Sequence, residues 1–355
     1  MATIDVILPV KNGIDYLAES LDSICNQTFQ DWRLLVLDHG STDGSRELAE
    51  SYHHRDPRVE VHSFPDAVGL AGLLNKGLDI CNCEYVMRQD ADDIACVDRM
   101  EITVSAFEKN PDIAVIAGQA TIINASGEQT GNLNMPLGVN RITVASFFVN
   151  PIAHPTVSFR FSSIKEMHIK YGIDFLNILP ESQKIRVDSL AEDYFLFGQL
   201  AILGKCLNLS NNLIKYRRHG ANVSILKFRD QMELSLNISR NLAKSFCAMH
   251  KLKDFDPMPF CNHGGLLFAF EPEQDFSNDF NEIKGTLISV IGKSVELDRE
   301  LAFRSILSTR NKFKLAFRYL FFHIKNLPES GEWYAIKTWL FGNALIKVKN
   351  LLNKK

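Results

Sequence analysis

The sequence predicts an α/β fold with a mostly parallel central sheet flanked by helices and a helical C-terminal extension. Two observations carry this prediction. Short apolar segments alternate with segments of helical spacing over the first 90 residues, and a polar or acidic loop directly follows two of the apolar segments. The 355 residues, 46% of them hydrophobic, are enough for about two domains or for one large domain with an appendage.

The first half of the chain contains a β-α-β pattern that repeats. An apolar strand begins at Ile4 and is closed by Pro9, whose nitrogen cannot donate to a sheet ladder. Helical spacing of Leu17, Leu21 and Ile24 follows, which indicates a parallel pair of strands joined by a helix. The expected elements are strands over 4–10, 33–37, 59–64 and 85–87 and helices over 14–26, 46–53 and 69–80.

Three carboxylates, Asp90, Asp92 and Asp93, lie within four residues directly after the expected strand at 85–87. At neutral pH their mutual repulsion must be offset by open solvent or by a bound cation. A divalent ion that takes oxygen ligands and bridges to a diphosphate meets this need. The alternative is a solvated acidic turn with no ligand.

Asp38 directly follows the second expected strand, where open α/β sheets bind their ligands. A ligand contact is favoured over capping of the next helix, because Ser41, Thr42 and Asp43 are better placed to cap it.

The overall composition restricts the cellular setting. The net charge of −3 gives no signature of nucleic-acid binding. Seven cysteines, an odd number, and the lack of a signal peptide before Ile4 predict a reducing cytoplasm. Cys81 and Cys83 have no second pair at zinc-site spacing and are interpreted as buried thiols. No run of eighteen apolar residues predicts an ordinary membrane-spanning helix.

Several ordered motifs resemble those of the family 2 glycosyltransferases, which have the GT-A fold. They are the segments 6–13, 27–29, 36–43 and 88–93. The resemblance covers about the first 225 residues and implies a catalytic domain over 1–225, with a nucleotide-binding half at 1–100 and an acceptor-binding half at 101–225. A helical and connector region at 226–303 and a basic amphipathic tail at 304–355 would follow.

The resemblance also implies roles for individual residues of the first half. Asp38 would contact the uracil or another base, Asp90 would lie near the ribose, and Asp92 would hold Mg²⁺ or Mn²⁺ on the donor diphosphate. His39 departs from the family pattern, which usually has a second acid there, and a titratable imidazole could alter nucleotide preference. The remaining residues assigned to the nucleotide sugar are Pro9, Val10, Asn75, Arg88 and Ala91.

Two segments of the second half are expected to meet the acceptor. A Gly- and Asn-rich loop is expected over 124–134, and the segment 150–160 after it resembles the family segment under the acceptor sugar. His154 is its exposed polar candidate, with a plain loop residue as the equal alternative. Ser189 is expected to cap a helix that contains Glu192 and Asp193.

The acids of this helix have two interpretations. They could simply complement the helix dipole. The family pattern instead implies that Asp193 is the catalytic base, within about 3 Å of the acceptor hydroxyl, and that Glu192 orients the acceptor.

A last strand and turn over 213–224 resembles the Arg-x-His-x-x-Asn-x-Ser ending of the family. The resemblance implies that His219 reaches back to the metal or the diphosphate. Together with Asp92 it would form a nitrogen and oxygen site that suits Mn²⁺ somewhat better than Mg²⁺. Arg217 and Arg218 are available to neutralise phosphate charge.

The C-terminal third lies beyond the family motifs. Residues 228–250 have helical periodicity, and residues 254–280, with a break at Gly264 and Gly265, form a connector. After Arg304 the cations alternate with Phe and Trp and meet only Glu329 and Glu332 as acids. This pattern favours a membrane-surface anchor, with packing on the catalytic domain or on a homodimer partner as the alternative.

The leading hypothesis is an inverting glycosyltransferase that moves a sugar from a nucleotide-diphosphate donor, with UDP as the expected nucleotide. The acceptor would be a saccharide or lipid-linked saccharide, as in bacterial surface polysaccharide synthesis. Two alternatives are a metal-dependent nucleotidyltransferase, for which Lys11-Asn12-Gly13 is a poor phosphate loop, and a non-catalytic saccharide-binding protein of the same fold.

Overall fold

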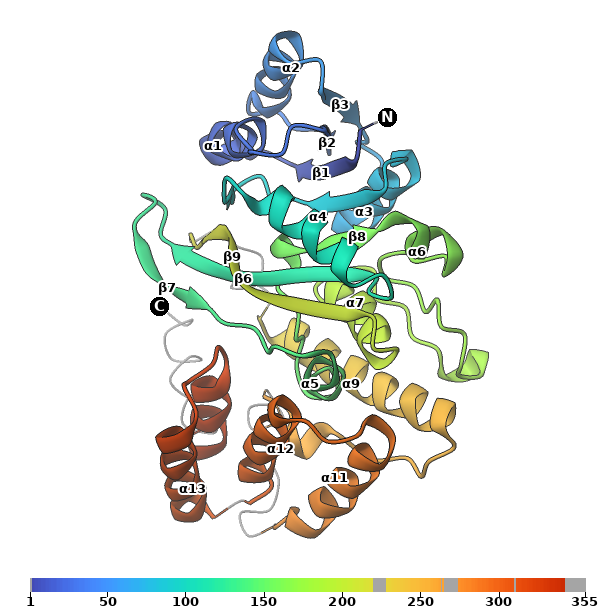
Figure 1. Ribbon diagram of the computed structural model, residues 1–355, viewed down its shortest axis with the longest axis vertical. Coiled ribbons are helices and arrows are strands. Elements are labelled where there is room, and N and C mark those ends of the chain that lie inside the picture. The colour runs from blue at the N-terminus through green and yellow to red at the C-terminus, as the bar shows by residue number, and fades with distance from the viewer. Residues whose placement is uncertain (1, 220–227, 263, 265–273, 310, 342–355) are drawn as a thin grey trace.

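The computed structural model describes residues 2–219, 228–262, 264, 274–309 and 311–341 (Figure 1). In this part of the chain a mixed sheet of nine strands has helices on both faces, and further helices form the C-terminal end. The strands are β1 (Ile4–Val10), β2 (Trp32–Asp38), β3 (Val59–Ser63), β4 (Tyr85–Arg88), β5 (Ile94–Ala95), β6 (Val115–Ile123), β7 (Gln129–Leu133), β8 (Ser158–Arg160) and β9 (Cys206–Arg217).

The helices of the catalytic part alternate with these strands. They are α1 (Ile14–Cys25), α2 (Ser45–Arg55), α3 (Gly69–Ile80), α4 (Arg99–Lys109), α5 (Val139–Ala145), α6 (Phe161–Glu166) and α7 (Glu192–Ile202), with the short 3-10 helices η1 (His154–Thr156) and η2 (Glu181–Gln183). The C-terminal extension contains α9 (Phe228–His250), η3 (Met258–Phe260), α11 (Ser277–Ile291), α12 (Val295–Leu307) and α13 (Lys312–Lys325).

The sheet has the order β3-β2-β1-β4-β8-β6-β9-β5, with β7 paired to β6. The first four strands in this order are parallel, as the sequence predicted. In the second half β8 runs antiparallel to both of its neighbours, β6 and β9 are parallel, and β5 is antiparallel to β9. The carboxyl ends of β1, β2 and β4 therefore meet at one edge, and β5 returns the chain from that edge to β9.

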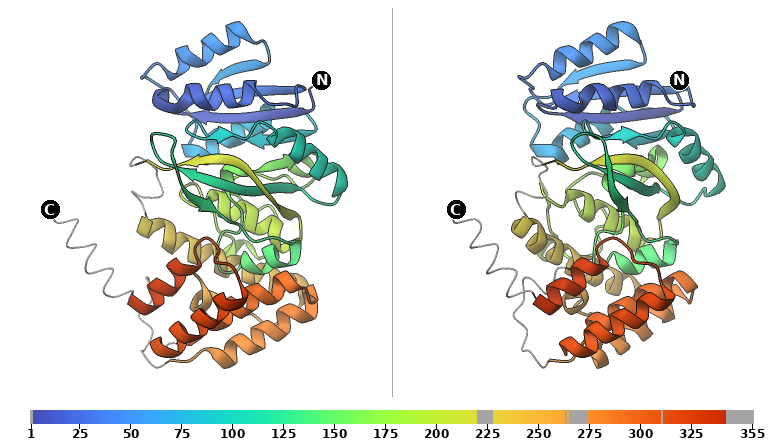
Figure 2. Two further views of the ribbon diagram at one scale, coloured as in Figure 1. Left: turned by 60° about the vertical axis from the view of Figure 1, so that its left-hand side comes forward. Right: turned by 90° about the vertical axis from the view of Figure 1, so that its left-hand side faces the viewer.

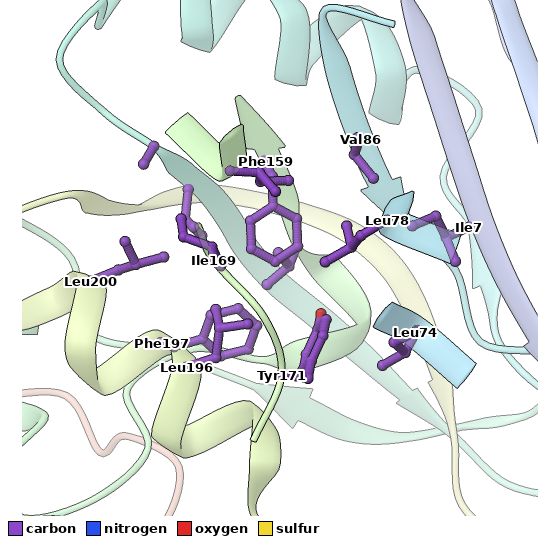
Figure 3. Packing of buried hydrophobic residues seen from close by; sticks show 14 of the residues in the cluster. Ile7, Leu74, Leu78, Val86, Phe159, Ile169, Tyr171, Leu196, Phe197 and Leu200 are labelled. Carbon is purple, nitrogen blue, oxygen red and sulfur yellow. The ribbon is translucent and has the colours of Figure 1, made fainter. Parts of the chain in front are cut away.

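Alternate residues of the parallel strands contribute to two separate cores, one on each face of the sheet. Val6 and Leu8 pack with the side chains of α1, whereas Ile7 packs with Leu74 and Leu78 of α3. The core that contains Ile7 extends to Phe159, Tyr171 and Phe197 (Figure 3). Helix α3 lies so close to the sheet that a Cβ at Gly77 would be 2.6 Å from Leu37 Cδ1, so a larger residue there would force Leu37 and Ile7 to shift.

Helices α9 to α13 form a third and a fourth core and pack on the catalytic part through α5 and α7 (Figure 2). The predicted boundary at 303/304 falls inside α12, where Arg304 is buried and donates 3.0 Å to the carbonyl oxygen of Phe260. The beginning of the basic segment is therefore part of the folded protein. Among the described helices, none combines the length and the apolarity that crossing a bilayer requires.

Other sequence predictions hold or fail locally. The bounds of α3 and α9 are those expected. The expected loop over 124–134 contains β7, because its residues 129–133 continue the ladder of β6. Ser189 does not cap α7: the helix begins at Glu192 after Ala191, and no side chain caps it. Gly265, Asn222, Ser224, Lys347, Lys349, Lys354 and Lys355 lie outside the described residues.

Candidate active site

The acidic segment forms a tight loop, which we call the acid loop (Asp90–Asp93), between β4 and β5. One carboxylate oxygen of each of Asp90, Asp92 and Asp93 lies within 4.8 Å of the others. Burial and the neighbouring negative charges raise the pKa of Asp90 and, more strongly, that of Asp93. The loop therefore holds negative charge that its surroundings only partly compensate, which is the electrostatic condition for binding a cation.

Two buried polar side chains fix the backbone of the acid loop. Gln89 Nε2 donates to the carbonyl oxygens of Asp93, at 2.9 Å, and of Asp90, at 3.2 Å. The guanidinium of Arg99 donates to Gln89 Oε1, at 2.9 Å, and to the carbonyl oxygens of Arg88, at 2.7 Å, and Pro155, at 3.1 Å. Neither residue was predicted to have a role: Gln89 is an uncharged residue within the acidic segment, and only the folded structure brings Arg99 back onto the acid loop.

His219 lies against the acid loop, and its contact with a metal or a diphosphate, which the family resemblance implies, stays a prediction. Its Nε2 is 2.9 Å from Asp92 Oδ2, and its ring lies 5.2 Å from that of Tyr16. The antiparallel pairing of Ile94 with Lys215 brings the end of β9 to this place. The pair Asp92 and His219 thus offers one oxygen and one nitrogen ligand at hydrogen-bond distance from each other.

Arg217 has a different role from the one predicted. It is buried: its backbone N–H donates 2.8 Å to Asp93 Oδ1, its Nε donates 2.9 Å to the carbonyl oxygen of Asp92, and its guanidinium pairs with Glu19 at 2.7 Å. It therefore supports the acid loop and is not free to bind phosphate. Arg218 is exposed and keeps its predicted role as a candidate.

Asp93 is a candidate ligand that the sequence analysis left out of the metal site. It is 1% exposed, and its Oδ2 has no hydrogen-bond partner in the part of the chain that the structure describes. Its spacing after Asp92 could have suggested this role, since all three acids were considered together as a charge problem.

The ends of β1 and β2 form the adjoining part of the site. Pro9 and Val10 are buried at the end of β1, and Val10 pairs with Asp38 across the ladder. Asp38 is also buried, and its oxygens accept from the backbone N–H groups of Ser41, at 3.0 Å, and Gly40, at 3.2 Å. Asp38 therefore shapes the turn that follows it, and its contact with a base stays a prediction.

Three other residues predicted to lie near the donor differ in their exposure and in their hydrogen-bond partners. Ala91 is half-buried inside the acid loop. His39 Nε2 donates to the carbonyl oxygen of Ala67 at 2.8 Å. Asn75 uses its amide on the backbone of Tyr171, with Oδ1 accepting at 2.8 Å and Nδ2 donating at 3.1 Å. This contact gives Asn75 a structural role, and its donor contact stays a prediction.

Arg88, at the end of β4, lies between the acid loop and the second half of the site. Its side chain is buried and pairs with Asp90, and its Nε has no hydrogen-bond partner among the described residues. Its positive charge opposes the rise that burial causes in the pKa of Asp90, Glu192 and Asp193, and it adds to the lowering that burial causes in the pKa of His154. One buried cation therefore acts on the acids of both halves.

Glu192 and Asp193 form the first turn of α7, where the N-terminal end of the helix faces the site. Burial raises the pKa of Glu192 to about 7, with the neighbouring charge of Asp193 adding to this, and raises that of Asp193 to about 6. Glu192 Oε2 is buried and has no hydrogen-bond partner among the residues described. The pair takes up a proton close to neutral pH, as a general base requires.

Asn150 holds the side chain of Asp193 in place. Its Nδ2 donates 3.0 Å to Asp193 Oδ2, and its Oδ1 accepts from the N–H of Ile152 at 3.2 Å, which fixes the orientation of the amide. A cavity of about 120 Å³ opens beside Asp193. Its polar lining includes Asn150 and, from α9, Gln231 and Ser235, so the C-terminal extension forms one wall.

His154 is placed beside this region but packed into the protein. Its Nε2 lies 3.1 Å from the hydroxyl of Tyr171, and its ring contacts that of Phe197 edge-on with centroids 5.6 Å apart. Burial, helped by the charge of Arg88, lowers its pKa well below the usual range, so the imidazole is neutral. These contacts explain its place in the core, and its predicted acceptor contact stays untested.

The donor set of the acid loop fits a divalent cation. Carboxylate oxygens with one imidazole nitrogen are ligands that Mn²⁺ accepts readily and Mg²⁺ tolerates. The unpaired buried Oδ2 of Asp93 and the raised pKa values of Asp90 and Asp93 are what a missing positive charge would correct. A larger cavity of about 460 Å³ lies in the C-terminal extension and is lined by none of the predicted site residues.

Comparison with known proteins gives the family. The profile of glycosyl transferase family 2 matches residues 5–168. An uncharacterised glycosyltransferase of Haemophilus influenzae is 31% identical over 245 residues, which are 67% of this chain and 72% of that protein. The hyaluronan synthase of Pasteurella multocida is 27% identical over 260 residues, 72% of this chain but 24% of the synthase.

A solved structure has the same fold over nearly the whole chain. The crystal structure of Staphylococcus aureus TarS 1-349 in complex with UDP-GlcNAc superposes with a TM-score of 0.52, covers 98% of this chain and 92% of that one, and is 16% identical. At that identity the likeness shows the fold alone. With the sequence relatives it leads to one conclusion: this chain belongs to glycosyltransferase family 2 and has the GT-A-like fold that its first strands and acid loop predicted.

Proposed function

We propose that this glycosyltransferase transfers a sugar from a nucleotide-diphosphate donor, a UDP-sugar, to a saccharide or lipid-linked saccharide acceptor with inversion at the anomeric carbon. Asp193 is the general base, Glu192 orients the acceptor, and the acid loop with His219 receives the diphosphate. The expected setting is bacterial surface polysaccharide synthesis in the cytoplasm, in keeping with the similarity to a hyaluronan synthase.

The observation that carries this proposal is the position of Arg88. Burial raises the pKa of Asp90 on one side and of Asp193 on the other, and the charge of Arg88 opposes both rises, so the acid loop and the base share one buried cation. Inverting transfer needs a base on the face of the sugar opposite the leaving diphosphate, and a sugar bound beside Arg88 would have the acid loop on one side and Asp193 on the other. No second carboxylate needs to form a covalent intermediate.

The acceptor hydroxyl is the nucleophile, and it must lose its proton during the reaction. The acceptor hydroxyl oxygen attacks the anomeric carbon, the bond from that carbon to the diphosphate oxygen breaks, and the hydroxyl proton passes to Asp193. The base must be ionised when the acceptor binds, and its pKa of about 6 allows this at neutral pH. Asn150 keeps one carboxylate oxygen occupied, which leaves the other to face the hydroxyl.

The donor side must stabilise the charge of the leaving diphosphate. Asp92 and His219, with Asp90 and Asp93 beside them, would hold Mn²⁺ or Mg²⁺, which neutralises that charge when bound. Pro9, Val10 and Asp38 would place the nucleotide at the carboxyl ends of β1 and β2, where open α/β sheets bind such ligands.

The hydrogen bonds of Lys11-Asn12-Gly13 disfavour a nucleotidyltransferase. The backbone N–H of Asn12 donates to Ser41 Oγ at 3.1 Å and that of Gly13 to Ser45 Oγ at 2.9 Å. The N–H of Ile14 donates to Asp43 Oδ2 at 3.0 Å. A loop that cradles phosphates needs free backbone N–H groups, and these three are already engaged.

The test is a donor panel followed by product analysis. Purified protein with Mn²⁺ is offered UDP- and GDP-sugars with saccharide acceptors, and the released nucleotide is measured. A UDP-sugar should be consumed, and NMR of the product from an α-linked donor should show a β linkage. An α linkage would refute the inverting mechanism, and release of sugar 1-phosphate in place of UDP or GDP would indicate attack at the α-phosphate and favour a nucleotidyltransferase.

A further inference from the structure

The outward face of α13 carries a continuous row of exposed apolar side chains. Phe313 at the start of the row is 90% exposed and Ile324 at its end is 72% exposed. At about 100° per residue, all members of the row lie on one side of the helix. In Figure 1, α13 lies at the outer edge of the C-terminal helices, with α12 between it and α11. The outer row consists of Phe313, Phe317, Leu320, Phe321 and Ile324.

The opposite side of α13 packs into the folded protein. Leu315 and Phe322 are buried in the fourth core together with Phe303 of α12. By the same helical spacing they lie about half a turn from the outer row. The helix is therefore apolar on both sides, and packing against α12 explains only the inner one. A contiguous exposed apolar surface on a soluble part of a protein indicates an interaction site.

Cations border the outer row on both sides. Lys314 and Lys325 lie along one edge of it and Lys312 along the other, and all three are exposed. Residues 312–328 contain no Asp or Glu. The next acids along the chain are turned toward the protein, since Glu329 pairs with Arg141 and Glu332 with Arg299. The surface that α13 presents is thus apolar in the middle and positive at its edges.

The neighbouring segment extends this surface. Trp333 is 59% exposed and its ring stacks with that of Tyr319 at a centroid distance of 6.3 Å. Tryptophan is the side chain most suited to the boundary between water and lipid. The sequence after residue 341, outside the described residues, adds four lysines and no acid.

We propose that the outer row of α13, with Lys312, Lys314 and Lys325, docks on the surface of an anionic phospholipid membrane. The apolar row would enter the boundary between headgroups and acyl chains, and the lysines would lie among the lipid phosphates. A second copy of this chain is a poorer occupant, because a two-fold contact brings the same three lysines of each copy together, and Asp275, whose pKa the charge of Lys314 helps to lower, supplies one acid against them. This docking goes beyond the transfer reaction and does not depend on it.

The experiment is sedimentation of the full-length protein with vesicles of two compositions, phosphatidylcholine alone and phosphatidylcholine with phosphatidylglycerol at 3:1. We expect binding to the anionic vesicles at low salt, and weaker binding at 0.5 M salt, where the Debye length is about 4 Å. The double variant Phe317→Ser with Phe321→Ser should weaken binding at least tenfold. Lys314→Glu with Lys325→Glu should weaken it by at least about twenty-fivefold, since each cation contributes about fivefold.

The matched control is Lys293→Glu with Val295→Ser, which makes the same types of change at two exposed positions at the beginning of α12. It should bind vesicles like the unchanged protein. Thermal melting and nucleotide release with a soluble acceptor should be unchanged in all variants, because none of these residues belongs to the active site. If the phenylalanine variant melts early, the lysine variant still decides the outcome.

Three results would overturn the proposal. The full-length protein could remain in the supernatant with anionic vesicles at low salt, or both α13 variants could bind as well as the control. Light scattering could also show a dimer that the phenylalanine variant converts to monomers, with no vesicle binding. That result would assign the outer row to a homodimer interface.

Discussion

Two groups of buried charges in this protein are built in opposite ways. The acid loop gathers three carboxylates, and the pKa values of Asp90 and Asp93 are raised. The C-terminal ion cluster instead alternates its charges, and the pKa of its central Glu300 is lowered by Arg304 and Arg141 despite burial. Its ion pairs join α5 to α12 and to the segment after α13 and involve Arg141, Arg299, Glu300, Arg304, Glu329 and Glu332.

The difference separates charge used for function from charge used for structure. A carboxylate whose folded pKa is lowered contributes stability above its unfolded pKa of about 4.3, and this is lost as the pH falls through the folded value. A carboxylate whose folded pKa is raised lowers the free energy of unfolding at high pH, and this loss develops as the pH rises through the folded pKa. The acid loop therefore costs stability at neutral pH and Glu300 adds to it, although burial raises the pKa of Glu332 in the same ion cluster.

The largest expected effect is the loss of activity in Asp92→Ala. Without this carboxylate the diphosphate loses the cation that neutralises its leaving charge, which is worth several kcal/mol. We expect turnover to fall at least about 10⁴-fold, measured as nucleotide release with Mn²⁺. The free energy of unfolding without metal should stay within about 0.5 kcal/mol or rise, because one of three like charges is gone.

The control for this change is Asp98→Ala, an exposed acid five residues after the acid loop that makes no capping hydrogen bond. It should keep full activity. Near-normal turnover of Asp92→Ala in the presence of a chelator would show that the acid loop is not a metal site.

The next largest effect is expected for Asp193→Asn. Removing the base should lower kcat by roughly 10² to 10⁴ while donor affinity stays within a few-fold. In the unchanged protein kcat should rise with pH between about 6 and 7, because the pKa values of Asp193 and Glu192 are about 6 and about 7. The variant should lose most of this dependence.

Asp188→Asn is the matched control for the base, since this exposed aspartate of the same segment pairs only with Arg186 among the described residues. It should leave kcat and its pH profile unchanged. If donor affinity collapses in Asp193→Asn and kcat at saturation does not, Asp193 is a binding residue.

The role of the C-terminal ion cluster in stability is tested by Glu300→Gln. This change leaves the buried guanidinium groups of Arg141 and Arg304 without their shared anion, and loss of one partner in a buried pair costs about 3 to 5 kcal/mol. Chemical denaturation should show this loss at pH 7 and less of it near pH 3. Glu296→Gln, an exposed position on the same helix, should change stability by less than about 0.5 kcal/mol.

The sequence was sufficient for much of the nucleotide-binding half. Its elements are local: each strand is a short apolar run, each helix has its own periodicity, and the acids stand directly after the strands. The pairing of Asp92 with His219 was expected only from the family resemblance. It depends on the ladder between β5 and β9, whose partners are more than a hundred residues apart.

The two errors about arginine residues have one physical cause, which is that long-range contacts decide what a charge does. Arg217 was expected to face phosphate, but the acid loop and Glu19 surround it. Arg304 was expected to begin an exposed basic tail, but it is buried, where it pairs with Glu300 of its own helix α12 and donates to the carbonyl oxygen of Phe260 in η3. Composition shows that a segment is basic, but only the folded structure shows which of its cations reach the surface.

The smallest expected effect tests how finely the base is positioned. Asn150 donates 3.0 Å to Asp193 Oδ2, and this hydrogen bond lowers the pKa of Asp193 against the larger effect of burial. In Asn150→Ala the carboxylate loses about 1 kcal/mol of stabilisation in its ionised form, so the acid limb of the kcat profile should move about 0.5 to 1 unit to higher pH. At pH 8 kcat should fall only a few-fold, whereas at pH 6 the loss should be larger. Asn132→Ala, an exposed asparagine on β7, should show neither change. A loss of activity that is equal at every pH would mean that Asn150 supports the fold of the 150–157 segment and does not position the base.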